Sequence, residues 1–184
     1  MNQRQLLTVD GAFADLGMSS VQLESEGRGF TFRRNEPLDM RMDRSVGKTA
    51  AEIIQVASEK TLADLIFEYG EERYSRRIAR AIVANRDREP FVSTGQLATL
   101  VRKVVPRRKG QRIDSATRTF QALRIYVNQE LSGLDVFIRN IFRRLRAGAR
   151  LVVVTFHSLE DRIVKHTFRD LAKSGDIPLR ILTK

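Results

Sequence analysis

Two short strings of the sequence place polar side chains at the end of an apolar run, where parallel sheets hold their ligands. The first string is Asp-Leu-Gly-Met-Ser-Ser at residues 15–20, which overlaps the end of the mostly apolar run 6–16. Asp15 offers a carboxylate that can accept hydrogen bonds from an amine or a ribose, and Gly17 lets a ligand approach the backbone. The alternative is a strand-terminating turn in which Asp15 only caps a helix. The spacing leaves both interpretations open.

The second string is Phe-His-Ser-Leu-Glu-Asp at residues 156–161, which ends the β-branched run 151–156. His157 is a candidate site residue, although a histidine at a strand end is often only a structural hydrogen-bonding group. Serine, histidine and aspartate all occur here, but the nucleophile-elbow pattern of hydrolases is absent. Ser158 with Asp161 resembles a helix capping box instead, so a hydrolase triad is not expected.

An arginine-rich segment, residues 69–80, places Arg73, Arg77 and Arg80 on one helix face. Such a face can contact the phosphates of a nucleic acid. The alternative is a solvated face that is linked to Glu72 by pairing at i,i+4 spacing. The sequence has neither a phosphate-loop pattern nor a glycine-rich dinucleotide motif, so a nucleoside triphosphate cofactor is not supported.

The composition favours a polyanionic partner. The 184 residues have a net charge of +11, and residues 70–118 carry 13 Lys/Arg against five Asp/Glu, a local charge of +8. The chain has no Cys and only two His, which excludes disulfides, thiolate metal sites and a His-rich metal site, and no metal is expected. No apolar run approaches the roughly 20 residues that span a bilayer. We therefore expect a cytoplasmic protein with no membrane partner.

The elements that must position these residues follow from periodicity and from Gly and Pro positions. Two buried strands are predicted at 6–16 and 151–156, with an irregular ordered segment at 27–48. Helical stripes are predicted within 49–57, 62–70, 71–85, 94–105, 120–131 and 134–145, and in a last helix from Ser158, whereas 106–114 is a basic loop. Gly148 is expected to end the helix that precedes the second strand.

The two apolar strands predict a parallel sheet with helices on both faces. Two strands cannot make such a sheet alone. We therefore expect that further strands either lie outside this chain or come from another molecule.

Seven strings together resemble the signature of the ribosomal RNA small subunit methyltransferase H family. They occur in the family's order, with few gaps, from about residue 9 to residue 170. The strings occupy residues 10–11, 15–23, 28–32, 37–43, 69–73 with 77–83, 117–125 and 156–165. Each string alone is weak, but the ordered set is highly specific.

The resemblance implies an α/β fold: a partial class I (Rossmann-like) S-adenosylmethionine-dependent methyltransferase sheet with an inserted all-helical subdomain. Residues 1–43 and 114–184 would be catalytic-domain segments, and residues 44–113 the helical insertion that recognises RNA. The implied reaction is methylation of cytidine N4 in the decoding region of 16S ribosomal RNA, within the small ribosomal subunit. A homodimer is a further partner arrangement that the sequence leaves open.

The resemblance also implies roles for individual residues. Asp15 and Gln22 match positions that bind S-adenosylmethionine, and Asp15, Ser19, Ser20 and His157 are the catalytic candidates. Because the cytosine N4 lone pair is delocalised into the ring, acceptors at the strand ends would orient the amine and take up positive charge. The expected RNA-binding residues are Arg73, Arg76, Arg77, Arg80, Arg107, Arg108, Lys109 and Arg112.

The sequence departs from the family pattern in one large respect. Family members begin with a further segment that bears the first sheet strand and a glycine-rich cofactor loop, and we expect this chain to lack that N-terminal cofactor-binding portion. Smaller departures are Met18, Val21 and Ala149. The alternative function is therefore a non-catalytic RNA-binding remnant of the same family.

Overall fold

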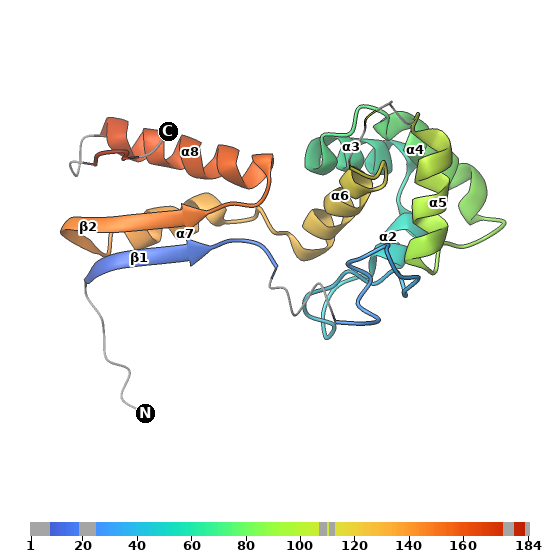
Figure 1. Ribbon diagram of the computed structural model, residues 1–184, viewed down its shortest axis with the longest axis horizontal. Coiled ribbons are helices and arrows are strands. Elements are labelled where there is room, and N and C mark those ends of the chain that lie inside the picture. Colours follow the sequence, from blue (N-terminus) through green and yellow to red (C-terminus); the bar gives the residue numbers. More distant parts are fainter. Residues whose placement is uncertain (1–7, 19–24, 107–109, 111–112, 175–178, 183–184) are drawn as a thin grey trace. The chain divides into compact units, whose positions relative to one another are not determined.

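The computed structural model describes residues 8–18, 25–106, 110, 113–174 and 179–182. The chain divides into two compact units (Figure 1). The first unit takes residues 1–17 and 131–184, and the second takes residues 18–130. The expected α/β class is confirmed, because the first unit contains parallel strands and both units contain helices.

The sheet of the first unit has two described strands, β1 (Val9–Asp15) and β2 (Leu145–Val154). They pair in parallel, and Figure 1 shows the two arrows side by side. Asp15 is the register partner of Val154, so the two strands end at the same edge. The predicted parallel sheet is therefore confirmed, with the two strands as each other's partners, and the edge at which a parallel sheet holds ligands is well defined.

Helices α7 (Leu134–Phe142) and α8 (Ser158–Ser174) cover one face of these strands. The small core between them contains Leu134, Ile138 and Val164, with Leu16, Leu151 and Val153 packed against it. Because side chains alternate along a strand, the neighbouring positions point to the other face. There Phe13 and Val152, which are register partners, are 69% and 50% exposed. Among the described residues the helices thus cover one face of the sheet, not both as expected.

The boundary before β2 also differs from expectation. Helix α7 ends at Phe142, and Gly148 lies inside β2 with a φ of 81°, so Gly148 does not end the helix. The strand begins at Leu145 instead of residue 151. The apolar spacing of this segment is equally compatible with a helix, so its conformation depends on tertiary contacts. The backbone N–H of Val9 donates to the carbonyl of Arg144 (2.8 Å), and this pairing with β1 makes the segment a strand.

The second unit contains five helices among its described residues. They are α2 (Ala50–Val56), α3 (Glu59–Gly70), α4 (Ser75–Arg86), α5 (Thr94–Val104) and α6 (Thr117–Asn128). Three of them begin at hydroxyl caps, since the side chains of Thr49, Ser58 and Ser93 each accept a backbone N–H of the first turn. The predicted apolar stripes are confirmed: Leu62, Leu65, Ile66, Ile78, Ile82, Leu97 and Val101 are buried, and Leu100 packs against them.

Helix α4 begins later than expected. The predicted helix ran over residues 71–85, but Glu71 adopts a left-handed conformation (φ 49°) that ends α3. The buried Glu72 carboxylate accepts the backbone N–H of Tyr74 (2.8 Å), and the helix starts at Ser75. Glu72 therefore lies outside the helix, which disfavours the alternative interpretation in which Glu72 pairs with an arginine of α4 at i,i+4 spacing.

The compact helical unit extends beyond the helical insertion expected at 44–113. Helix α6 belongs to it: Gly70 packs so closely that a Cβ there would lie 3.2 Å from the Cβ of Ala122. The irregular segment 25–48 belongs to it as well, through backbone bonds from Leu38 to Val92 (3.0 Å) and from Thr94 to Glu36 (2.8 Å). Contacts distant in sequence therefore widen the unit to residues 18–130.

Candidate functional site

The carboxyl edge of the sheet brings together Asp15, Gly17 and Phe156. Asp15 ends β1 and is exposed. The backbone N–H of Leu16 still donates to the carbonyl of Val154 (3.0 Å), so both chains leave the sheet together. Gly17 has a φ of +99°, and a Cβ placed on it would lie 3.0 Å from Cδ2 of Phe156. The two strings singled out in the sequence thus meet at this edge, and a glycine is needed where they touch.

His157 holds the turn between β2 and α8. Its Nδ1 accepts the backbone N–H of Glu160 (3.4 Å), and the Glu160 carboxylate accepts the backbone N–H of Phe156 (2.9 Å). Because Nδ1 is an acceptor, the neutral ring carries its proton on Nε2, which lies 3.3 Å from Oε1 of Glu160 without the alignment of a hydrogen bond. Ser158 is the first residue of α8, and His157, which precedes it, accepts a backbone N–H of the first turn as a helix cap does.

Glu160 is a buried carboxylate, only 3% exposed. Burial by itself raises the pKa of Glu160. The His157 imidazole and the backbone N–H of Phe156 together lower this pKa by more than burial raises it, so the net pKa lies below the usual value. The carboxylate is therefore ionised at neutral pH and holds the Phe156 turn through a charge-assisted hydrogen bond.

The chemistry of this edge suits a ligand that has hydrogen-bond donors and a planar ring. The Asp15 carboxylate can accept hydrogen bonds from hydroxyl or amino groups. The Phe156 ring is 65% exposed and offers a flat apolar surface. Three further residues expected at this edge, Ser19, Ser20 and Gln22, lie outside the described residues.

A basic surface, made by Arg73, Arg76 and Arg77, lies at the start of α4 in the second unit. The guanidinium of Arg73 stands 4.5 Å from the centre of the Tyr74 ring, and that of Arg77 stands 5.6 Å from it. Arg76 is exposed, and among the described residues neither Arg76 nor Arg77 has a carboxylate within 4 Å. Cations that are exposed and unneutralised are available to phosphate groups.

The other residues expected to contact RNA lie in surroundings different from those of Arg73, Arg76 and Arg77, or outside the described residues. Arg80 lies 3.4 Å from Glu59, so an acidic side chain already faces it. Arg118 of α6 is not among the residues expected from the sequence. It donates to the backbone carbonyl of Glu71 (3.2 Å), two residues before Arg73. The expected loop contacts Arg107, Arg108, Lys109 and Arg112 lie outside the described residues.

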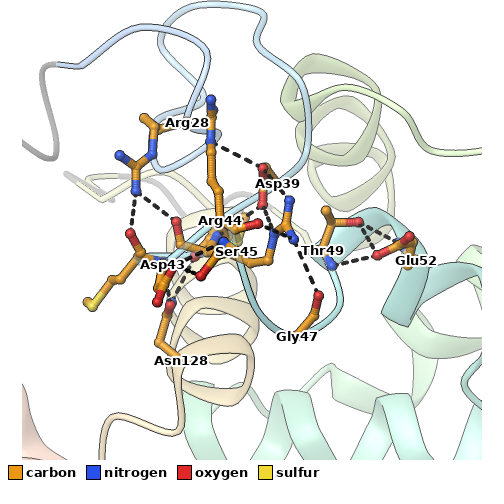
Figure 2. A network of polar contacts seen from close by, with 12 residues as sticks. Arg28, Asp39, Asp43, Arg44, Ser45, Gly47, Thr49, Glu52 and Asn128 are labelled. Carbon is orange, nitrogen blue, oxygen red and sulfur yellow. Dashed lines mark hydrogen bonds and ion pairs between the residues drawn. The ribbon is translucent and has the colours of Figure 1, made fainter.

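The segment after β1 contains a dense polar network (Figure 2). Arg28 donates to the carbonyls of Arg41 and Met42 (both 2.8 Å), and Asn128 bridges Met42 N (2.6 Å) and Met40 O (2.8 Å). Figure 2 shows Asp39 at the centre, between two arginine side chains. Arg28 thus binds backbone carbonyls, and Arg41 and Arg44 bind the Asp39 carboxylate. Since all of these partners belong to the protein itself, the string at residues 37–43 stabilises the fold.

An open cavity of about 460 Å³ lies in the second unit along α5. Asn35, Asn85, Glu89, Gln96 and Lys103 are among its polar lining residues. None of the site residues expected from the sequence lines it, and Gln96 is already bonded to Glu89 (3.2 Å) and to the Ser93 cap.

Sequence reasoning missed three residues that the structure brings into these sites. Phe156 and Glu160 stood inside a recognised string, but no periodicity indicates that one is exposed and the other buried. Tyr74 had a usable signal, since an aromatic residue between basic ones is typical of nucleic-acid surfaces.

No helix among the described residues is long and apolar enough to cross a membrane.

The family model described as the MraW methylase family matches residues 1–184. Ribosomal RNA small subunit methyltransferase H of Acidobacterium capsulatum is 53% identical over 168 residues, which are 91% of this chain and 56% of that protein. The protein of the same name from Trichlorobacter lovleyi is 50% identical over 98% of this chain and 58% of its own length. That of Synechocystis is 54% identical over 98% and 57%. The chain therefore spans little more than half the length of these curated relatives.

Proposed function

Because the chain belongs to the MraW methylase family, we propose that it acts in S-adenosylmethionine-dependent methylation of 16S ribosomal RNA, at N4 of a cytidine in the decoding region. The observation that carries the proposal is the family match over residues 1–184. Relatives about half identical to the chain are named as methyltransferases of small-subunit ribosomal RNA. The proposed substrate also suits a cytoplasmic protein.

Methyltransferases of this family use S-adenosylmethionine, which when bound supplies an electrophilic methyl group. We assign its hydroxyl or amino contacts to Asp15 and, by resemblance, to Gln22. Support comes from the position of Asp15, which is exposed at the carboxyl end of a parallel strand. Gly17, with its φ of +99°, lets the backbone that follows Asp15 come into contact with the Phe156 ring at the same edge.

In the proposed reaction, Asp15 orients the cytosine amine. Its carboxylate accepts a hydrogen bond from one N4 hydrogen, which directs the nitrogen lone pair at the methyl carbon. When the amine is methylated it must lose one proton, and this carboxylate would accept it; Ser19 and Ser20 stay further candidate acceptors by resemblance. His157 is less suited to this role, because its Nδ1 already accepts a backbone N–H.

RNA would bind along the basic surface of α4, with Arg73, Arg76 and Arg77 at phosphates. Arg80 and the basic loop residues Arg107, Arg108, Lys109 and Arg112 remain part of the proposed path. The local charge of +8 in residues 70–118 supports it, because backbone-phosphate binding depends on the number of cations at the surface.

Methyl transfer is tested by incubating the chain with small-subunit particles and S-adenosylmethionine labelled in the methyl group, then digesting the RNA to nucleosides. Label in N4-methylcytidine is the expected result. Label in another nucleoside would correct the position, and RNA binding without any label would favour the second candidate, a non-catalytic RNA-binding protein of the same family. That candidate is favoured by the local charge of +8 in residues 70–118, which supports RNA binding whether or not a methyl group is transferred.

RNA binding is tested by the salt dependence of affinity for 16S ribosomal RNA. The double variant Arg76→Ala/Arg77→Ala should flatten the slope of log K against log salt by roughly one to two units, because fewer counterions are released. The matched control is Lys60→Ala/Arg102→Ala, which removes the same charge from cations already paired with Asp64 (2.6 Å) and Asp114 (2.8 Å). Equal slopes in the two variants would show that α4 is only a solvated face.

A further inference from the structure

Phe156 differs in position from the exposed apolar residues of the two strands. Phe13 and Val152 lie within the strands, on the open face of the sheet, where a packing partner would cover them. Phe156 lies two residues beyond the end of β2, at the carboxyl edge that Asp15 also occupies. A ring that is 65% exposed at this edge is positioned to meet a ligand, because ligands of parallel sheets bind outside the carboxyl ends.

The backbone that carries this ring is held from two directions. On one side, the edge of the ring faces Gly17, where a side chain would come within 3.0 Å of Cδ2. On the other side, the Phe156 N–H donates to Glu160 (2.9 Å), a carboxylate that is 3% exposed. The Glu160 N–H in turn donates to His157. Two buried side chains thus fix the turn that presents an exposed aromatic ring, which is the arrangement expected of a preorganised contact.

We propose that Phe156 is the surface on which a nucleobase stacks at the carboxyl edge of β1 and β2, next to the Asp15 carboxylate. The inference rests on the proposed function for the identity of the ligand. Every nucleobase has a π-face that stacks on an aromatic side chain, and its exocyclic amine or ribose hydroxyl suits a carboxylate acceptor. The base is either the target base of the RNA or the adenine of the cofactor, since both share this chemistry.

The absence of tryptophan from the sequence allows a direct test on the full chain. The variant Phe156→Trp places a single fluorophore at the proposed stacking position, and Phe13→Trp places one on the open sheet face of the same unit. Each is titrated with cytidine 5′-monophosphate, with S-adenosylmethionine and with ribose 5-phosphate, which has no base. We expect saturable quenching of Phe156→Trp by a ligand that has a base, none by ribose 5-phosphate, and no saturable response of Phe13→Trp.

The ligands separate the two sources of the base. Quenching by cytidine 5′-monophosphate alone assigns the surface to the RNA, and quenching by S-adenosylmethionine alone assigns it to the cofactor. The same linear quenching in both variants would indicate collisions and overturn the proposal, as would no quenching of Phe156→Trp at millimolar ligand when its circular dichroism matches that of the unmodified chain.

A second pair of variants separates this inference from the proposed function. Phe156→Leu keeps apolar volume and loses the ring, whereas Phe156→Tyr keeps the ring. Affinity for the quenching ligand, measured by calorimetry, should fall roughly tenfold in Phe156→Leu and stay within about twofold in Phe156→Tyr. If methyl label enters the RNA equally well with Phe156→Leu and with the unmodified chain, the stacking role is wrong and the methylation stands. If the base binds as expected but no label enters RNA, the stacking surface stands and the methylation is wrong.

Discussion

At the scale of single residues, Asp39 shows how a carboxylate is used to hold a segment without regular structure. It accepts bonds from Arg41 (2.7 and 3.2 Å) and lies 3.4 Å from Arg44 (Figure 2). Burial by itself raises the pKa of Asp39. The hydrogen bonds from Arg41 and the charges of Arg41 and Arg44 lower this pKa by more than burial raises it. The net pKa lies below the usual value, so ionised Asp39 stabilises the folded state.

The variant Asp39→Asn should lower the free energy of unfolding at pH 7 by about 1–3 kcal/mol, because a charge-assisted pair is lost from a largely buried position. A depressed folded-state pKa gives stability that is present above the unfolded pKa, about 3.9, and is lost as pH falls through the folded pKa. The difference between variant and unmodified chain should therefore shrink when urea unfolding is repeated at pH 3.

The control is Asp43→Asn, whose carboxylate is exposed and accepts from Ser45 two residues away. It should destabilise less than Asp39→Asn. A difference between Asp39→Asn and the unmodified chain that is the same at pH 7 and pH 3 would show that the ionised form of Asp39 has no special role.

At the scale of elements, the segment 25–48 is irregular but tightly determined. Gly29 is buried, has a φ of +75°, and donates its N–H to the buried Glu36 carboxylate (3.0 Å). A Cβ on Gly29 would overlap the carbonyl oxygen of Pro37 and lie 2.8 Å from the backbone nitrogen of Asp39. The segment thus crosses itself where only a glycine fits, which explains its order without helix or strand.

Replacing Gly29 with alanine should therefore destabilise the protein more than replacing Gly27. Both glycines have positive φ, so each variant loses about 1 kcal/mol to backbone strain. Only Gly29→Ala meets other atoms, since a Cβ on Gly27 has nothing within 4 Å, and the overlap should cost about 1–3 kcal/mol more. Thermal unfolding followed by circular dichroism should show the lower midpoint for Gly29→Ala, and equal midpoints would contradict the described crossing.

At the scale of the whole molecule, the two units differ in the cores that they possess. The second unit buries a large cluster that draws on segment 25–48 and on all five of its described helices. In the first unit, the core cluster has only three buried residues, Leu134, Ile138 and Val164. Phe13 is exposed on the uncovered face of the sheet. A two-stranded sheet with one covered face is marginal by itself.

We expect the units to differ accordingly in local stability. In hydrogen exchange of the full chain, amides of α3, α4 and α6 should be protected by the global free energy of unfolding, whereas those of β1 and β2 should exchange through local opening. A fragment of residues 18–130 should remain helical and unfold cooperatively. Uniform protection in the full chain, together with an unfolded fragment, would show that the second unit is not independently stable.

The candidate sites were only partly predictable from the sequence. Asp15 was recognised because a carboxylate that follows an apolar run predicts a strand end, and its register partner Val154 confirms that position. Phe156 was not selected, because its exposure depends on how β2 meets Gly17 and on the turn held by Glu160. Arg80 was grouped with Arg76 and Arg77 from helix spacing, yet only the fold brings Glu59 against it.

Residue patterns alone are enough to predict the α/β class, the apolar faces of the helices and the two buried strands that need parallel partners, because periodicity and capping are local properties of the chain. Tertiary structure alone decided where several elements begin and end. Leu145 joins a strand because β1 offers backbone partners, and α4 starts at Ser75 because Glu72 is buried under it. It also decided that Phe156 and Gly17 meet, since contacts between residues far apart in the chain depend on packing that no local pattern records.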